Sequence, residues 1–301
     1  MERMFKQWWR SDEHFYWMLI LPAALVFVTL GLYPLLSTIF LSFRECILSQ
    51  PWRGVPYVAF SNYSYFLNSE LFWKVIKNTI VFVVFSVSIE FIVGFFAAWL
   101  LNLDTRGKSF LRMAILLPWS IPIVIAGLCF RFMYNDIFGV INAMLLKVHL
   151  LKYPVAWIGD NTYAMGALVF ADIWKSFPII AFLLLAGLQQ IPTALYEAAN
   201  IDGASPIQSF FFITIPLLKR TIFIALAFRT MQAVSFAFDI VYSLTRGGPG
   251  DSTQVLVSLS HKYSFQFMQF GKGSTLAILT LLVSFIFGSV FIILLLKAAR
   301  Q

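Results

Sequence analysis

Charged side chains are scarce in this sequence. Only 12% of its 301 residues are Asp, Glu, Lys or Arg, and 60% are apolar. Soluble domains carry about 25% charged and about 45–50% apolar residues. The composition therefore excludes an ordinary soluble domain and favours a membrane protein. The net charge of +8 fits basic loops beside membrane helices, and no basic stripe interleaved with aromatic residues indicates a nucleic-acid partner.

The usual signatures of a cofactor site are also missing. The two cysteines imply no disulfide framework, and the three histidines are scattered without metal-ligand spacing. A nucleotide-binding P-loop requires an earlier glycine before its Gly-Lys-Ser/Thr end. The only fragment is Gly107-Lys108-Ser109, and the earlier glycine position holds Asn102. We therefore expect no metal, no cofactor and no ATP hydrolysis on this chain.

Six apolar runs are long enough to cross a bilayer, which needs about 20 residues. They lie at residues 15–40, 79–101, 111–133, 163–188, 217–244 and 275–296. We predict an all-α integral membrane protein with one transmembrane domain over residues 1–301 and several passes through the cell membrane. Six spans place both termini on one side. The Lys and Arg residues of the loops favour cytoplasmic termini only weakly, because the two sides carry similar totals.

The polar segment 189–216, between the fourth and fifth runs, has the pattern of a helical hairpin. Residues 193–200 are good helix formers, and Gly203 suits a left-handed stop. Ser205 reads as an N-cap, Pro206 as the first helical residue, and Gln208 completes a capping box. Pro216 bends or ends the second helix. A surface loop that only joins two spans remains an equal alternative on this chemistry alone.

Polar residues inside the apolar runs are candidates for a transport path, because ionisable groups in a membrane span usually face a cavity or a partner. On the fifth run, Arg229, Gln232, Ser235 and Asp239 fall on one stripe at helical spacing. Asp172 is three residues from Lys175 and can pair with it. Structural pairs Asp172–Lys175 and Arg229–Asp239 are an equal alternative. Glu90 and Arg131 are further ionisable residues in such runs.

The hairpin also carries a family motif. Glu197-Ala198-Ala199, Asp202-Gly203-Ala204 and Ile213-Thr214-Ile215-Pro216 resemble the signature of permease subunits of binding-protein-dependent ATP-binding-cassette (ABC) importers. Ile215 replaces the usual Leu. Leu244-Thr245-Arg246-Gly247-Gly248-Pro249 resembles a segment of the carbohydrate-uptake branch, of the maltose and trehalose type. The likeness covers nearly the whole chain.

The resemblance implies a coupling role for the hairpin. In such permeases it is the coupling helix that docks on a cytoplasmic ATPase, which places both termini of this chain in the cytoplasm. The coupling residues implied are Glu197, Ala198, Ala199, Asp202, Gly203 and Ala204. The implied partners are a second permease, two ATPase subunits that hold ATP and Mg, and an extracytoplasmic sugar-binding protein.

The resemblance also places a sugar path between two permeases in the inner membrane, surrounded by lipid. Lys175, Ser176 and Thr230 fall at sugar-contacting positions of the maltose-type permease, although the side chains differ there. The candidate pathway residues are Asp172, Lys175, Ser176, Arg229, Thr230, Gln232, Ser235 and Asp239. A di- or oligosaccharide such as trehalose or maltose is the expected substrate. An ion-coupled secondary transporter is the alternative, but no inverted repeat is visible. A membrane-embedded enzyme ranks last.

Overall fold

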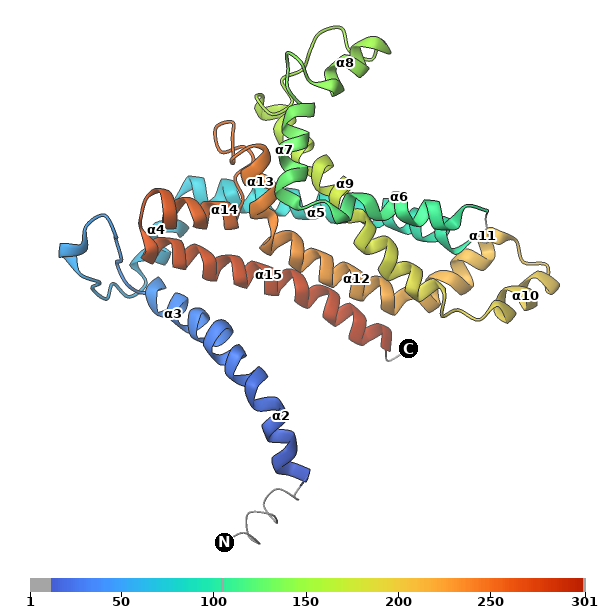
Figure 1. Cartoon of the computed structure of the whole chain (residues 1–301), viewed down its shortest axis with the longest axis horizontal. Coiled ribbons are helices and arrows are strands. Elements are labelled where there is room, and N and C mark those ends of the chain that lie inside the picture. Colours follow the sequence, from blue (N-terminus) through green and yellow to red (C-terminus); the bar gives the residue numbers. More distant parts are fainter. Residues whose placement is uncertain (1–11, 104–105, 300–301) are drawn as a thin grey trace.

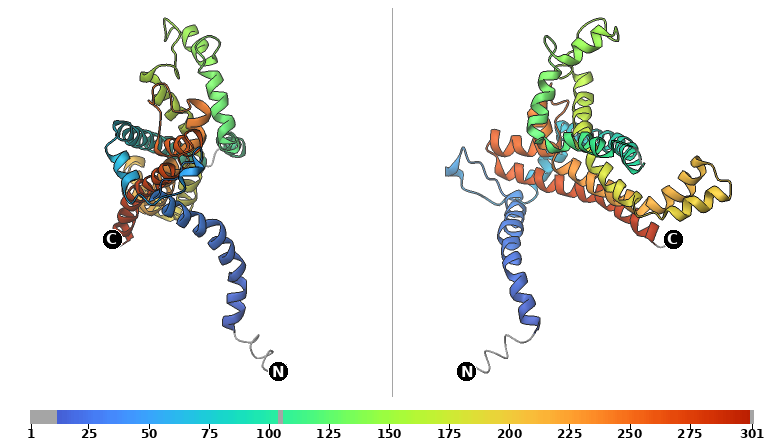
Figure 2. Two further views of the ribbon diagram at one scale, coloured as in Figure 1. Left: turned by 90° about the vertical axis from the view of Figure 1, so that its left-hand side faces the viewer. Right: turned by 45° about the vertical axis from the view of Figure 1, so that its right-hand side comes forward.

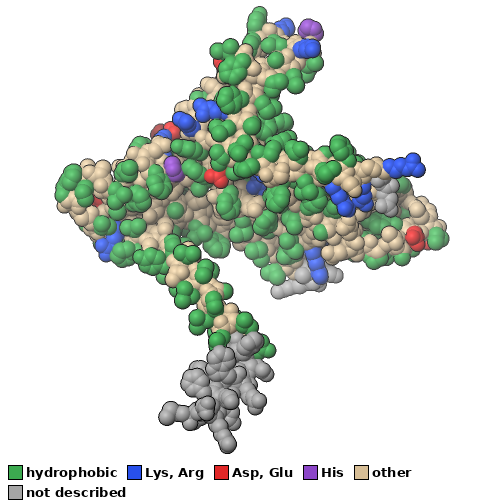
Figure 3. All heavy atoms as spheres, viewed as in Figure 1, with side chains coloured by type: hydrophobic (Ala, Val, Ile, Leu, Met, Phe, Trp, Pro, Cys, Tyr) green, Lys and Arg blue, Asp and Glu red, His purple; other side chains and the backbone are tan. Residues whose placement is uncertain are grey.

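The computed structural model describes residues 12–103 and 106–299, and this part of the chain is built from helices with no β-strand beyond two isolated bridges. Five helices are long and apolar enough to span a membrane, or six if one bent pair counts as a span. This confirms the all-α membrane fold. Hydrophobic side chains cover much of the face seen in Figure 3, while most of the charged ones gather toward its ends.

The first half of the chain forms two long helices and a compact outer segment. The first long helix stands away from the rest of the molecule (Figures 1 and 2). The elements are α2 (Asp12–Val26), a π-helical segment (Phe27–Leu32), α3 (Tyr33–Ser42), a 3₁₀ turn (Pro51–Arg53), α4 (Ser61–Leu67) and α5 (Glu70–Asn102). The predicted second run is the inner part of α5, which starts nine residues earlier than residue 79.

The middle of the chain holds the bent pair and the hairpin. The elements are α6 (Lys108–Ser120), α7 (Ile123–Met133), α8 (Val140–Lys147), α9 (Asn161–Leu188), α10 (Thr193–Ile201) and α11 (Pro206–Ser209). The carboxylate of Asp160 accepts a hydrogen bond from the Thr162 backbone N–H at 2.7 Å and caps α9. This bond lowers the pKa of Asp160.

The last third contains the fifth and sixth runs. The elements are a π-helical segment (Phe210–Thr214), α12 (Ile215–Ser235), α13 (Ala237–Leu244), α14 (Leu256–His261), a second π-helical segment (Lys262–Gln266) and α15 (Phe270–Ala299). α15 packs along α12 and α3. The hairpin α10–α11 and α4 lie at opposite ends of the molecule (Figure 1).

Two predicted spans are not single straight helices. The run 111–133 is broken between α6 and α7, which meet at 91°. Ile121 and Pro122 are extended there, because the residue before a proline is pushed out of the helical region and proline has no N–H to donate. The run 217–244 is interrupted at Phe236, which separates α12 from α13.

The core lies where α5, α9, α12 and α13 meet. Phe82, Leu168, Val234 and Ile240 are buried in its largest cluster. α5 and α9 approach closely at Gly94, where an added Cβ would lie 2.9 Å from Cγ2 of Ile180. Small residues at such crossings allow helix backbones to pack tightly in a membrane. This packing fixes the positions of the polar side chains described next.

Candidate functional site

The hairpin has the local geometry that its sequence predicts. Gly203 has φ of +80°, and the Ala204 N–H donates to the carbonyl of Ala199 at 2.9 Å. This is a glycine-terminated helix end, in which N–H groups beyond the helix donate to carbonyls of its last turn. Ser205 and Gln208 form the predicted capping box, with Ser205 N donating to Gln208 Oε1 at 2.7 Å.

The surface of the hairpin is open and contains a pocket of about 380 Å³. Of the six predicted coupling residues, Glu197, Ala198, Asp202 and Gly203 are exposed, and Ala199 and Ala204 are half-buried. The last two line the pocket together with Asp202 and Gly203. All six therefore lie together on one surface element.

Large apolar side chains on the hairpin were not singled out from the sequence. Ile201, Ile207 and Phe212 are 87%, 70% and 79% exposed. Ile201 ends the short helix α10, whereas Ile207 and Phe212 lie on the helical stretch Pro206–Ser235, which is long enough to span a membrane. Phe212 lines the pocket, and an exposed apolar side chain beside a pocket is characteristic of a protein-binding surface.

One hydrogen bond ties the hairpin to the membrane helices. The hydroxyls of Tyr196 on α10 and Thr214 are 2.8 Å apart. Thr214 is buried at the end of the π-helical segment that continues directly into α12. This contact and the chain itself are therefore two links between α10 and α12.

A charged cluster joins three helices in the core. Arg229 on α12 donates to both carboxylate oxygens of Glu90 on α5, at 2.6 and 2.8 Å, and to Asp172 on α9 at 2.6 Å. All three residues are buried. A buried guanidinium is stable only when paired in this way, since an unpaired charge in a membrane span is costly.

The two pairs considered from the sequence are therefore wrong. Asp172 pairs with Arg229 rather than with Lys175, and Arg229 does not pair with Asp239. The i, i+3 spacing placed Asp172 and Lys175 on one face, but the closer guanidinium comes from another helix. Glu90 was noted in the sequence without a partner. A lone carboxylate in an apolar run was the only signal for its role.

Lys175 has a different partner. Its Nζ donates to the carbonyl of Trp119 at 2.8 Å. Trp119 lies in the last turn of α6, beside the bend into α7, where carbonyls have no helical N–H to accept from. A cation also stabilises the negative end of a helix. Lys175 therefore holds α9 against the bend.

The eight predicted pathway residues fall into two groups. Asp172, Lys175, Ser176, Arg229 and Thr230 are buried, whereas Gln232 and Asp239 are half-buried and Ser235 is exposed. The break at Phe236 separates Asp239 from the α12 part of the predicted stripe. Only the second group therefore has exposed surface in this chain. The described residues contain no group of three His, Cys, Asp or Glu side chains that could hold a metal ion.

Residues 90–299 match the family model described as binding-protein-dependent transport system inner membrane component. The chain belongs to this family. It is the permease component of an ABC importer, and the ATPase is a separate subunit. The family assignment removes the ion-coupled transporter from consideration.

Curated relatives cover nearly the whole chain. The trehalose/maltose transport system permease protein MalF of Thermococcus litoralis is 38% identical over 92% of each chain. The sulfoquinovosyl glycerol transport system permease protein SmoG of Agrobacterium fabrum is 34% identical over 97% of this chain and 94% of the relative.

A solved structure has the same fold. A bacterial ABC transporter involved in the import of the acidic polysaccharide alginate contains a chain with a TM-score of 0.81 and 23% identity, and the match covers 99% of both chains. At this identity the match supports the architecture of the permease and carries no information about the transported solute.

Proposed function

We propose that this permease imports a sugar, forms half of the translocation path, and couples that path to ATP hydrolysis through the hairpin α10–α11. The structure of the hairpin is the main support for the coupling role. It presents all six motif residues, a pocket and exposed apolar side chains at one end of the molecule.

The proposed complex contains a second permease, two ATPase subunits with ATP and Mg, and an extracytoplasmic sugar-binding protein. The hairpin and both termini lie in the cytoplasm. When the ATPases close, they push α10, and the Tyr196–Thr214 hydrogen bond carries this displacement to α12. Rocking of α12 against α5 and α9 then alternates access to the path.

Carbohydrate as the substrate class is supported by the relatives. Their names specify trehalose, maltose, maltodextrin and sulfoquinovosyl glycerol, all of which contain a sugar ring. A disaccharide or oligosaccharide of the trehalose or maltose type fits the 38% identical relative best. Gln232, Ser235 and Asp239 supply hydrogen-bonding groups of the kind that bind sugar hydroxyls, and Phe236 and Phe238 supply aromatic faces beside them.

Substitution of Gly203 tests the docking role. An added Cβ at Gly203 meets no atom within 4 Å, and φ is +80°. Gly203→Leu therefore costs only backbone strain of about 1–2 kcal/mol within the chain. We expect this variant to lose co-purification of the ATPase, because the leucine side chain projects from the docking surface.

Gly54 provides a stringent control at the end of the molecule opposite the hairpin. It also has a positive φ, +67°, and open space around it, and its ψ of −155° lies in a region essentially restricted to glycine, so leucine is strained at least as much there as at Gly203. Gly54→Leu should therefore retain the ATPase at the wild-type ratio in the same affinity pull-down. Equal ATPase recovery with Gly203→Leu and with wild type would refute the docking role.

A further inference from the structure

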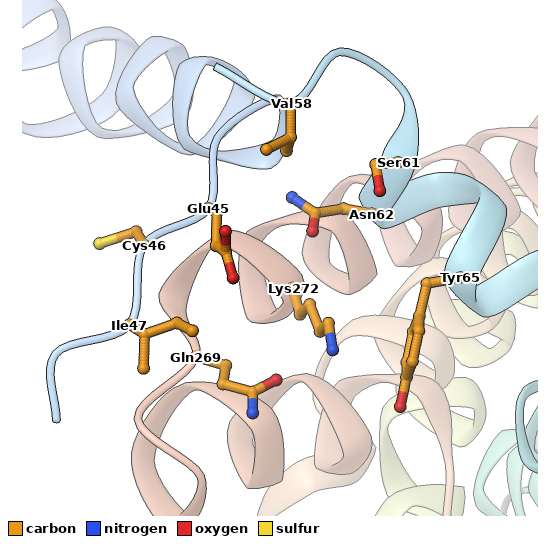
Figure 4. A pocket seen from close by; sticks show the side chains of 9 residues that line it. All are labelled: Glu45, Cys46, Ile47, Val58, Ser61, Asn62, Tyr65, Gln269 and Lys272. Carbon is orange, nitrogen blue, oxygen red and sulfur yellow. The ribbon is translucent and has the colours of Figure 1, made fainter. Parts of the chain in front are cut away.

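A small cavity lies at the end of the molecule opposite the hairpin. Its volume is about 260 Å³, and its walls come from the segment after α3, from α4, and from the start of α15 (Figure 4). The lining residues are Glu45, Cys46, Ile47, Val58, Ser61, Asn62, Tyr65, Gln269 and Lys272. None of them belongs to the hairpin or to the candidate path.

The walls are held in place by several hydrogen bonds. Asn62 Nδ2 donates to the carbonyls of Ser42 and Arg44, both at 2.9 Å. The Gly271 N–H donates to the carbonyl of Cys46 at 3.3 Å, and Ile47 forms a β-bridge with Gln269. These hydrogen bonds fix the relative positions of segments that are far apart in the sequence, so the cavity has a defined shape.

Three polar side chains extend into this cavity. Glu45 and Lys272 point into it from opposite walls, and Gln269 lies below them (Figure 4). The Lys272 ammonium lies 3.7 Å from the centroid of the Tyr65 ring. Gln269 Oε1 is buried and accepts no hydrogen bond. An unsatisfied buried acceptor costs free energy, so it favours a ligand that brings a donor.

We propose that this cavity binds one ring of a neutral, hydroxyl-rich sugar. The lining carries one charge of each sign, Glu45 and Lys272, and the Glu45 carboxylate also lies 3.7 Å from a guanidinium nitrogen of Arg53, so the cavity favours neither an anion nor a cation. A neutral polyol satisfies both walls, because each hydroxyl donates to the Glu45 carboxylate or to Gln269 Oε1 and also accepts from Lys272. The assignment of sugar as the ligand class rests on the proposed function.

The size of the cavity limits what enters it. Sites for drug-sized ligands occupy about 300–1,000 Å³, so a cavity of about 260 Å³ holds a single ring with the remainder of a longer saccharide outside. The site is separate from the path near Gln232. It gives the permease a second point of contact with its substrate at the end opposite the ATPase.

Cys46 provides a reporter inside the cavity. It is half-buried, and Cys129 in α7 is the other cysteine. In a Cys129→Ser background, the complete transporter in lipid nanodiscs is alkylated with a small maleimide at increasing concentrations of trehalose, maltose or glucose. Burial raises the pKa of the Cys46 thiol, so the reaction is run at alkaline pH to supply thiolate.

We expect at least one sugar to slow alkylation of Cys46 along a saturable curve. The rate should fall about fivefold when the sugar is at about four times its Kd, because the free fraction falls by that factor. Glycine at equal osmolality should have no effect. No slowing by any of the sugars, or equal slowing by glycine, would overturn the proposal.

Two variants and a control assign the effect to the cavity. Glu45→Ala and Gln269→Leu should weaken protection. Glu70→Ala removes the same charge at the same end of the molecule, but Glu70 does not line the cavity, so it should leave protection unchanged. If Cys46 does not react, Ser61→Cys serves as the reporter thiol in a background that lacks both native cysteines. Ser61 is exposed and lines the cavity.

ATP-dependent sugar uptake by the same complex in proteoliposomes separates the two proposals. Uptake without protection at the cavity would reject the cavity site and leave the proposed function standing. Protection by a sugar without uptake would reject the transport role and keep the site.

Discussion

At the scale of single residues, Arg229 links three helices of the core. It joins carboxylates from α5 and α9, and all three groups are buried. Lys175 adds a second positive charge close to Asp172 and Arg229, so the four formal charges sum to zero. The cluster is therefore stable as a unit and costly to break at one member.

Replacing Arg229 by Met should destabilise the protein by about 3–5 kcal/mol, because two buried carboxylates lose their partner. Adding Glu90→Gln and Asp172→Asn to Arg229→Met should restore most of the stability, since no uncompensated carboxylate remains there. Thermal unfolding of the detergent-purified protein measures both. An Arg229→Met variant with an unchanged melting temperature would contradict this account.

The open polar residues should behave differently. Gln232 and Asp239 are half-buried, so part of each residue is accessible to a ligand. Gln232→Ala and Asp239→Ala should each raise KM for sugar uptake about 2- to 10-fold, the loss of one hydrogen bond, and leave complex assembly intact. Thr29→Ala, at an exposed position on the first long helix, serves as the control. Normal uptake in both test variants would remove them from the path.

At the scale of elements, the hairpin depends on the contact between α10 and the buried Thr214. Tyr196→Phe and Thr214→Val each remove the same hydrogen bond. Each should lower ATPase activity stimulated by the binding protein about 2- to 10-fold, with unchanged binding of the ATPase subunit. Thr214→Val also removes a long hydrogen bond, 3.5 Å, from Thr214 Oγ1 to the Ser209 carbonyl. The double variant should therefore be no worse than Thr214→Val, because Tyr196→Phe then removes no further bond.

Tyr153→Phe is the control for this pair, since Tyr153 lies in the segment between α8 and α9, far from the hairpin in sequence. Effects of the two single variants that add up in the double variant would show that Tyr196 and Thr214 act separately.

The sequence predicts best those elements whose conformation is determined by interactions between residues close together in the chain. Gly203, Ser205 and Gln208 specify the hairpin through interactions with their own neighbours, and the structure has each of them as expected. Pro122 also causes the bend between α6 and α7 locally. The residues on both sides of Pro122 are apolar, so hydrophobicity alone predicted one continuous span. The partner of Asp172 could not be found from spacing, because Arg229 reaches it from another helix.

At the scale of the whole molecule, the proposed docking has a consequence for the orientation of the chain in the membrane. The hairpin lies at one end and α4 at the other (Figure 1). The loop charges nearly balance across the two sides, so the positive-inside rule decides little here. The proposed docking of the hairpin on an ATPase implies that the hairpin end faces the cytoplasm, because ATP is supplied from there.

Thiol labelling at the two ends tests this orientation. In a Cys46→Ser, Cys129→Ser background, Ser61→Cys and Ser205→Cys each place one exposed thiol at the start of a helix. Ser205→Cys removes the hydroxyl that accepts from the Gln208 N–H but keeps the other half of the capping box, in which the backbone N–H of residue 205 donates to Gln208 Oε1. A membrane-impermeant maleimide should label the Ser61→Cys variant in spheroplasts. It should label the Ser205→Cys variant only after permeabilisation, because the bilayer otherwise separates the reagent from the hairpin. The reverse pattern would invert the proposed topology.

Thiol labelling with and without the ATPase subunit tests docking as well as orientation. In permeabilised membranes, the Ser205→Cys variant should react quickly when the ATPase subunit is not expressed and slowly when it is, since docking covers the hairpin. Labelling of the Ser61→Cys variant should not depend on the ATPase. If the hairpin thiol reacts equally with and without the ATPase, the docking proposal is wrong, whereas the orientation is unaffected. The same pair of variants therefore tests docking and orientation separately.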